Sequence, residues 1–180
     1  MVYVALLRGI NVGGKNKVEM KKLKATFEGA GMTDVTTYIN SGNVVFKSTA
    51  RKAAELEAKL EKAIERDFGF SIKVLLRNLT SMKRLDQALP ANWTNDSEMR
   101  CDVLFLWKEF DKPSVVKELP TKPELDEVMY VPGAIIWRVD RTNVTRSGMP
   151  RLVGSALYKG MTIRNCNTAR KLTAIMETLA

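Results

Sequence analysis

The chain has 180 residues, 45% of them hydrophobic and 27% charged, which excludes a largely disordered protein and suits one large domain or two small ones. It contains no histidine, which excludes Ser-His-Asp and Cys-His triads and histidine-ligated metal sites. The net charge of +9 is carried by residues 1–93 and 141–180, while residues 94–140 are net negative. This pattern predicts an anionic partner, with a merely solvated basic surface as the alternative.

The first elements predicted along the chain are a strand and a helix. Residues 2–8 form an apolar run of strand length. Met20, Leu23, Phe27 and Ala30 then recur at helical spacing. They predict a helix over residues 17–31, with Asn16 as its N-cap and Glu19 completing a capping box.

The next elements complete a recognisable order in the first half. Two strand-like segments, 35–40 and 43–48, flank Ser41-Gly42, which predicts a tight hairpin turn. Residues 51–68 have the strongest helical pattern, and residues 71–77 form another strand. The resulting β-α-β-β-α-β order is that of the ferredoxin-like split motif. The sequence therefore predicts an α+β fold with a ferredoxin-like first half.

A second, smaller α+β subdomain is predicted after a linker. Residues 78–89 are expected to be helical, and residues 90–98 are rich in Asn, Ser and Thr. We expect a ferredoxin-like subdomain at 1–89, a linker at 90–98 and a second subdomain at 99–180, a diverged repeat of the first being one interpretation. Its expected elements are strands at 101–108, 127–131, 134–140 and 161–164, helices at 113–119 and 150–159, and a last helix capped by Asn167.

Residues 9–16 resemble a phosphate-binding P-loop with a different last residue. Gly9, Gly14 and Lys15 fit the spacing G-x-x-x-x-G-K-[ST], but Asn16 stands where a hydroxyl residue would hold magnesium. P-loop enzymes also need a parallel α/β sheet, whereas the β-α-β-β order predicts an antiparallel one. Nucleotide hydrolysis is therefore not expected. No other catalytic constellation is recognisable, so the sequence leaves open whether the protein is an enzyme.

The predicted fold brings this loop next to the hairpin turn at 40–43. The first and third strands of a ferredoxin-like sheet are antiparallel neighbours, so the end of one lies beside the start of the other. Exposed amides and a helix start favour an anion there. The alternative is that glycines and asparagines simply form tight connections. The candidate ligand-binding residues are Arg8, Asn11, Gly13, Gly14, Lys15, Asn40, Ser41 and Asn43.

A second polar segment, residues 164–168, precedes the last predicted helix. Arg164 and Asn165 complete the set of candidate ligand-binding residues, since a helix start favours anions. The alternative is a simple helix cap, with Arg164 on a surface strand. The two cysteines, Cys101 and Cys166, lack metal-type spacing, so we expect free thiols and no metal site.

Nucleic acid is an alternative partner that the sequence favours less. The RNA-recognition module shares the β-α-β-β-α-β order, but it stacks bases on aromatic residues of its first and third strands. Those strands offer only Tyr3 and Phe46 here. A basic surface that binds nucleic acid is one alternative function, and a protein-interaction module without any small-molecule ligand is another.

Three segments of the chain together resemble a known family. They are residues 7–16 (LRGINVGGKN), residues 38–43 (YINSGN), and residues 162–165 (TIRN) with Thr168 and Lys171-Leu172. The chain resembles the bacterial family catalogued as domain of unknown function 1697. This resemblance implies a ferredoxin-like first half followed by a second α+β subdomain. It implies no activity and no catalytic residues.

The expected function is binding of a small anionic ligand, most naturally a phosphorylated one, where loop 9–16 meets turn 40–43. The N-terminal residues lack the features of a signal peptide, and no apolar run is long enough to span a bilayer, so we expect a cytoplasmic location and no membrane partner. Any cofactor, and the oligomeric state, are unknown from the sequence.

Overall fold

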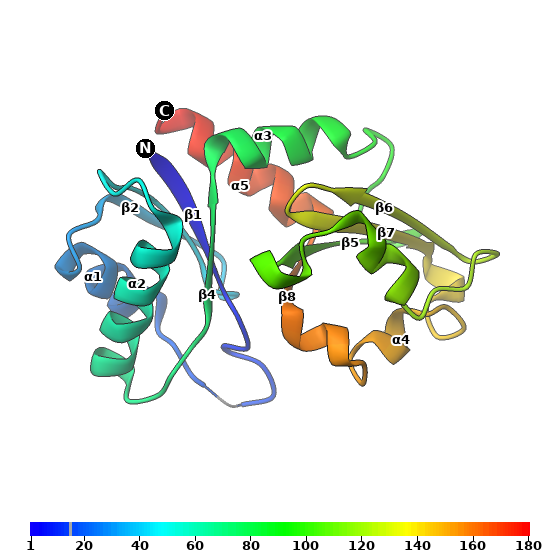
Figure 1. Cartoon of the computed structure of the whole chain (residues 1–180), viewed down its shortest axis with the longest axis horizontal. Helices are drawn as coiled ribbons and strands as arrows, with labels where there is room; N and C mark the ends of the chain where they lie inside the picture. Colours follow the sequence, from blue (N-terminus) through cyan, green and yellow to red (C-terminus); the bar gives the residue numbers. More distant parts are fainter. Residues whose placement is uncertain (15) are drawn as a thin grey trace. The chain divides into compact units, whose positions relative to one another are not determined.

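The computed structural model describes residues 1–14 and 16–180 and has an α+β fold (Figure 1). It divides into two compact units, Met1–Thr80 with Leu172–Ala180, and Ser81–Lys171. Each unit contains a four-stranded antiparallel sheet, which confirms the predicted fold class. The division into subdomains 1–89 and 99–180 with a linker at 90–98 remains a prediction.

The first unit has the ferredoxin-like order of elements. Its sheet has the strand order β2-β3-β1-β4, and every neighbouring pair is antiparallel. This confirms that the first and third strands are central neighbours. The elements are β1 (Val2–Leu7), α1 (Met20–Gly29), β2 (Thr33–Tyr38), β3 (Asn43–Lys47), α2 (Ala53–Phe68) and β4 (Val74–Asn78).

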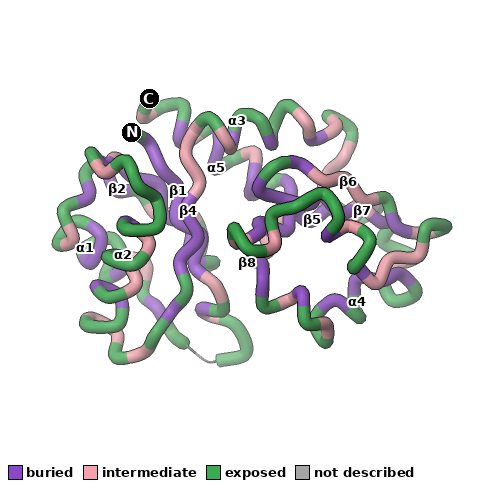
Figure 2. The backbone as a smooth tube through the Cα atoms, viewed as in Figure 1, coloured by how far each residue is buried: buried purple, intermediate pink, exposed green. Residues whose placement is uncertain are grey.

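One face of this sheet forms a core with α1 and α2. Leu23 and Phe27 of α1 and Leu60 of α2 are fully buried there because they recur at helical spacing. Phe27 meets Phe46 of β3 edge to face, with ring centroids 5.4 Å apart. All six residues of β1 are buried, so this strand is covered on both faces (Figure 2). That explains its uninterrupted apolar sequence.

The hairpin between β2 and β3 is longer than predicted. The last residue pair of the two strands is Tyr38 with Asn43, so residues 39–42 form the connection. The expected two-residue turn at Ser41-Gly42 is therefore wrong. Ile39 takes a left-handed conformation with φ of 46°, which ends β2 two residues earlier than the apolar pattern suggested.

The second unit repeats the strand order of the first. Its sheet has the order β6-β7-β5-β8, again antiparallel throughout, so the third strand of the four lies beside the first. This shared order supports the interpretation as a diverged repeat, which stays a prediction. The strands are β5 (Met99–Leu106), β6 (Asp126–Val131), β7 (Ala134–Asp140) and β8 (Met161–Asn165).

Short helical segments replace long helices in the second unit. The helix predicted at 150–159 is interrupted, because α4 spans only Met149–Leu152 and a 3-10 helix occupies Ala156–Gly160. Between them Ser155 is extended, and its hydroxyl donates to the Leu152 carbonyl oxygen over 2.7 Å. Further 3-10 helices are Lys108–Phe110, Pro113–Glu118 and Arg141–Asn143.

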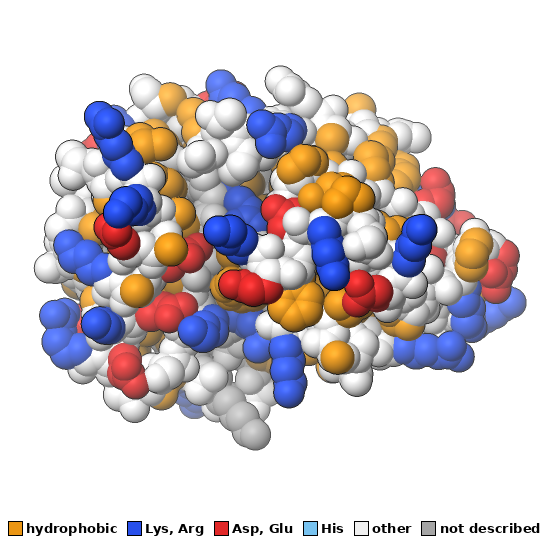
Figure 3. Space-filling view, viewed as in Figure 1, with side chains coloured by type: hydrophobic (Ala, Val, Ile, Leu, Met, Phe, Trp, Pro, Cys, Tyr) orange, Lys and Arg blue, Asp and Glu red, His pale blue; other side chains and the backbone are white. Residues whose placement is uncertain are grey.

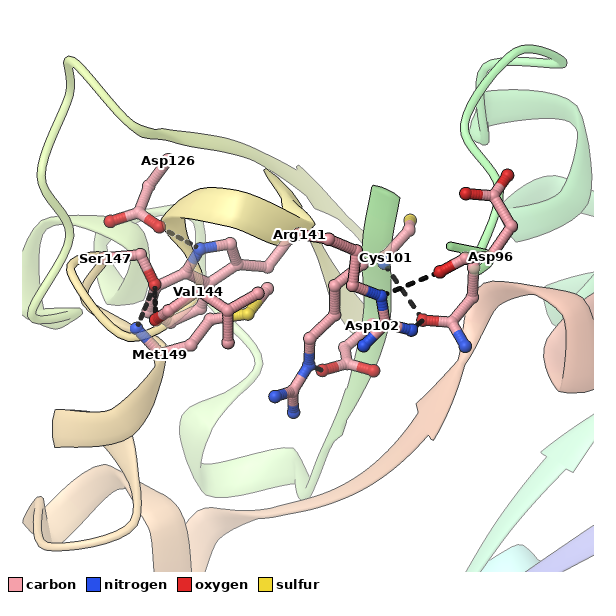
Figure 4. A network of polar contacts seen from close by, with 11 residues as sticks. Asp96, Cys101, Asp102, Asp126, Arg141, Val144, Ser147 and Met149 are labelled. Atoms are coloured by element: carbon pink, nitrogen blue, oxygen red, sulfur yellow. Dashed lines mark hydrogen bonds and ion pairs between the residues drawn. The ribbon is translucent and has the colours of Figure 1, made fainter. Parts of the chain in front are cut away.

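The buried carboxylate of Asp126 organises the core of this unit. It accepts a hydrogen bond from the Trp137 indole nitrogen over 2.9 Å, which Figure 4 marks at Asp126. It also accepts hydrogen bonds from the backbone nitrogens of Lys122 and Gly148 over 2.7 and 2.8 Å. Trp137 is fully buried, so its N–H needs such a partner. Asp126 therefore joins β6 and β7 to two loops.

The division between the units falls within two helices, α3 (Leu79–Ala88) and α5 (Cys166–Thr178). Both were predicted, α3 within one residue at each end. Among the residues that the model describes, no helix is both long and apolar enough to cross a membrane.

We expect Gly42→Ala to destabilise the first unit more than Gly69→Ala does. Both glycines have left-handed backbones, with φ of 72° and 79°, which costs an alanine about 1 kcal/mol. At Gly42 a Cβ would also lie 2.7 Å from Ile10 Cδ1 and 2.8 Å from Leu7 Cβ, whereas nothing lies within 4 Å at Gly69. This overpacking should lower the free energy of unfolding of Gly42→Ala by a further amount of about 1–3 kcal/mol, measured by urea unfolding. Equal losses for the two variants would contradict this packing.

Candidate functional site

The connection from β1 to α1 is a closed loop. The Asn11 backbone nitrogen donates to the Asn16 carbonyl oxygen over 3.1 Å, and the Asn16 side-chain amide donates to the Gly9 carbonyl oxygen over 3.0 Å. Asn11 and Asn16 both have left-handed backbones, with φ of 54° and 49°. Asparagine adopts this conformation more readily than most other residues. Asparagines at these two positions therefore set the shape of the loop.

The Asn11 carboxamide joins this loop to the hairpin connection. Its Nδ2 donates to the carbonyl oxygens of Val18 and Asn40, each over 3.0 Å. Its Oδ1 accepts a hydrogen bond from the Val18 backbone nitrogen over 2.8 Å. Both amide hydrogens and the oxygen are thus engaged within the protein. The structure therefore brings loop 9–16 and turn 39–42 together, and Asn11 holds them.

The loop does not lead directly into a helix. The predicted helix 17–31 is present as α1, but its predicted start and its N-cap at Asn16 are wrong, since α1 begins at Met20 and Glu19 is its N-cap residue. The Asn16 side chain closes the loop instead of capping the helix. Because three residues separate Asn16 from Met20, the helix dipole contributes less to a site at the loop than the sequence suggested.

The tip of the loop has exposed backbone at its two glycines. Gly13 and Gly14 are exposed and have φ of 59° and 75°. Apart from the chain neighbours of each glycine, no heavy atom of the described residues lies within 4 Å of the position that a Cβ would occupy at either glycine, or at Gly9. Among the described residues, none accepts a hydrogen bond from the backbone nitrogen of Gly13 or Gly14. A ligand could therefore approach these amides closely.

The hairpin connection contributes polar groups and one strained residue. Asn40 and Ser41 are exposed. Ile39 beside them is a β-branched residue with φ of 46°, a conformation that is rare for such side chains, and it is 49% exposed. Strained, exposed residues of this kind concentrate at functional sites.

Asn43 lies under the site and not on it. Its side chain is fully buried, and its Nδ2 donates to the Tyr38 carbonyl oxygen over 3.1 Å. In the sheet it pairs with Leu6 and with Tyr38. Asn43 thus closes the hairpin, and a direct contact with a ligand at the loop would require it to leave this position.

The sequence predicts that Arg8 and Lys15 supply the positive charge of the candidate site. Arg8 is half-buried, and its backbone nitrogen donates to the Lys73 carbonyl oxygen over 3.0 Å, which fixes the start of the loop against β4. Lys15 lies outside the described residues. In the described part of the chain, no group of three or more Cys, Asp or Glu side chains is arranged to hold a metal ion.

Arg164 and Asn165 belong to the second unit, and their contribution to the loop site stays a prediction. Arg164 is buried, which lowers the pKa of its guanidinium to about 10, and it donates to Thr162 Oγ1 and the Ile163 carbonyl oxygen. It is therefore not on a surface strand, as the alternative interpretation supposed.

The N-cap of α5 is Asn165 and not Asn167. The Asn165 Oδ1 accepts a hydrogen bond from the Thr168 backbone nitrogen over 2.8 Å, which satisfies one free amide of the first turn. The Asn167 side chain instead donates to the Asn95 carbonyl oxygen over 2.9 Å. The predicted cap was two residues late because helix α5 begins directly at the end of β8.

Two exposed aliphatic residues beside the polar groups were not predicted. Val12, which follows Asn11, is 69% exposed, and Ile39, which precedes Asn40, is 49% exposed. Asn11 and Asn40 are the two partners of the hydrogen bond that joins loop and turn. In the sequence Ile39 belongs to the strand predicted at 35–40, and Val12 belongs to the glycine-rich loop 9–16. The backbone is left-handed at Ile39 and at Asn11, directly before Val12, and no pattern in the sequence predicts either conformation.

Comparisons with known proteins identify the family of the chain without an activity. Residues 1–137 match the family model described as protein of unknown function, DUF1697. A solved structure of a conserved bacterial protein from Streptococcus pneumoniae is 31% identical, covers 97% of this chain and 98% of its own, and has a TM-score of 0.83. No similar sequence is found among curated proteins.

We expect Asn11→Ala to destabilise the first unit by about 1–3 kcal/mol, because it removes three hydrogen bonds and leaves the Val18 backbone groups without partners. Asn16→Ala is the matched control, since it removes one exposed side-chain bond from the same loop. Urea unfolding measures both, and amide exchange at Val18 should accelerate in Asn11→Ala alone. Unchanged exchange at Val18 would contradict the role of Asn11.

Proposed function

The chain belongs to the DUF1697 family of unknown function, and on this premise we propose that it binds a small phosphorylated ligand where loop 9–16 meets turn 39–42. One observation carries the proposal. The Asn11 side chain bonds to Asn40 and to Val18, which holds an exposed glycine loop against an exposed polar turn. Such an arrangement presents donors from two segments to one ligand.

The backbone of the loop tip is the main recognition element. Gly13 and Gly14 have positive φ and open space around them, so a phosphate could approach their amides without a steric clash. Anions bind well to groups of backbone amides of this kind, because the donors are fixed before the ligand arrives. Asn40 and Ser41 would add oriented side-chain donors from the turn.

Charge and positioning are divided among the remaining candidates. Arg8 and Lys15 supply the positive charge, Lys15 on the ground of its sequence position alone. Asn11 and Asn43 act by positioning the loop and turn, since their side chains are engaged within the protein. Arg164 and Asn165 would join this site only if the second unit contributes to it.

The same groups favour binding over hydrolysis of the ligand. Asn16 has no hydroxyl for magnesium, and its amide is used to close the loop. The sheet is antiparallel, unlike the parallel sheets of P-loop enzymes. If a reaction occurs, Arg8 and Lys15 are suited to stabilising developing negative charge and not to moving protons.

Nucleic-acid binding by a basic surface is less well supported. Lysines and arginines over α1 and α2 are interspersed with acidic side chains in the view of Figure 3. Several are paired with those acids, as Lys24 is with Glu28 and Lys73 with Glu61. A mixed surface of this kind attracts a polyanion less than a continuous basic stripe does.

We expect a phosphorylated compound to raise the melting temperature of the wild-type protein, and Lys15→Ala to weaken that response. A ligand at about 100 times its Kd stabilises the folded state by about 2.7 kcal/mol, which corresponds to several degrees. The screen compares pyrophosphate, nucleotides and sugar phosphates. Lys17→Ala is the matched control, because it removes the same charge two residues beyond and should leave the response unchanged.

Two results would contradict the proposal and point to the alternatives. The first result is that only oligonucleotides raise the melting temperature, by the same amount in both variants, and that this rise falls steeply with added salt. It would show that the basic surface binds nucleic acid. If no phosphorylated compound changes the melting temperature, the loop and turn have a structural role, as an interaction module would require.

A further inference from the structure

The two cysteines of the chain lie opposite each other in the second unit. Cys101 is in β5, and Cys166 is the first residue of α5, directly after β8. The register of β5 and β8 pairs Asp102 with Asn165, so one further step along both segments brings residue 101 opposite residue 166. Both thiols are free and fully buried. Their separation of 65 residues in the sequence gave no indication of this pairing.

The residues around Cys166 favour its thiolate form. The Cys101 thiol donates a hydrogen bond to Cys166, the Arg170 guanidinium lies 4.0 Å from Cys166 Sγ, and the Asn167 backbone nitrogen also donates. These interactions lower the pKa of Cys166, while donation to Cys166 and burial raise the pKa of Cys101. The pair is therefore asymmetric, with one thiol suited to attack and the other to follow.

A segment of residues 90–98, called here the covering segment, is tied to this pair. The Cys166 thiol donates to the Trp93 carbonyl oxygen over 3.6 Å, and the Cys101 backbone nitrogen donates to Asn95 Oδ1 over 3.4 Å. Figure 4 shows Cys101 next to Arg141, which donates to the Asp96 carbonyl oxygen over 2.8 Å. The segment contains no helix or strand, and these contacts hold it together with those of Asn95 to Asn167 and of Glu98 to Arg141.

Arg170 links the covering segment to the same cysteine. Its Nη1 donates to the Trp93 carbonyl oxygen and its Nη2 to the Pro90 carbonyl oxygen, each over 2.7 Å. The guanidinium thus contacts the covering segment and Cys166 Sγ together. A chemical change at Cys166 would therefore alter the hydrogen bonds that hold residues 90–98.

We propose that Cys101 and Cys166 form a redox pair which hydrogen peroxide converts into an intrachain disulfide. The Cys166 thiolate attacks one peroxide oxygen, the O–O bond breaks, and the other oxygen leaves as water after taking up a proton, which gives a sulfenic acid. The Cys101 sulfur, on losing its proton, then attacks the Cys166 sulfur and displaces the hydroxyl as a second water. Each sulfur is oxidised by one electron, and the peroxide takes up both.

Disulfide formation would release part of the covering segment. The disulfide has no S–H group, so the hydrogen bond from Cys166 to the Trp93 carbonyl oxygen is lost. A disulfide sulfur also cannot ionise, so the attraction of Arg170 that lowers the pKa of the Cys166 thiol is lost. Residues 90–98 would then be held by fewer contacts in the oxidised protein, and a thiol reductant would restore them.

The test is treatment of the full-length protein with hydrogen peroxide, followed by peptide mapping without reductant. We expect a peptide pair joined through Cys101 and Cys166, reversed by dithiothreitol, and faster proteolysis within residues 90–98 of the oxidised form. The proposal would be overturned if both cysteines of the peroxide-treated protein could still be alkylated after unfolding. It would also be overturned if disulfides formed only between molecules.

Single variants test the order of attack. In Cys101→Ser, Cys166 should accumulate as a sulfenic acid that dimedone traps. In Cys166→Ser, Cys101 should react at least about tenfold more slowly, since reactivity follows the thiolate fraction. Equal rates in the two variants would overturn the assigned roles, and the wild-type mapping does not depend on either variant folding.

Discussion

The carboxamide of Asn11 is the group on which the candidate site depends. It forms hydrogen bonds to Val18 on one side and to Asn40 on the other, and so joins two segments that are 29 residues apart in the chain. Its own backbone is left-handed, which few residues other than glycine and asparagine adopt readily. Without this amide the loop and the turn would keep the bond between Leu7 and Gly42 but lose their side-chain link.

The sheet determines which end of the molecule carries the site. β1 lies between β3 and β4, and the Leu7 backbone nitrogen donates to the Gly42 carbonyl oxygen, so the loop starts where the hairpin turns. The second unit has the same strand order, but β5 leads into a 3-10 helix at Lys108–Phe110 with no glycine. The two units therefore share their topology, while the glycines and asparagines of the described part of loop 9–16 occur in the first unit alone.

The sequence predicted features that depend on periodicity and missed those that depend on backbone conformation. Helix α2 and the strand order followed from apolar spacing, and the strand order brought the loop to the turn. The position of Asn16 could not be predicted, because an asparagine before a helical pattern can either cap the helix or close a loop. The left-handed Ile39 and the pairing of Cys101 with Cys166 depend on tertiary contacts that no local pattern contains.

A titration of the isotope-labelled protein with pyrophosphate, followed by amide NMR, tests the central claim most directly. The account predicts saturable shifts at the amides of Gly13, Gly14, Asn40 and Ser41 in the wild-type protein, with loop and turn responding together at one Kd. In Asn11→Ala the loop and turn should no longer respond together. No shift at these amides, or shifts confined to the lysines of α2, would contradict the account.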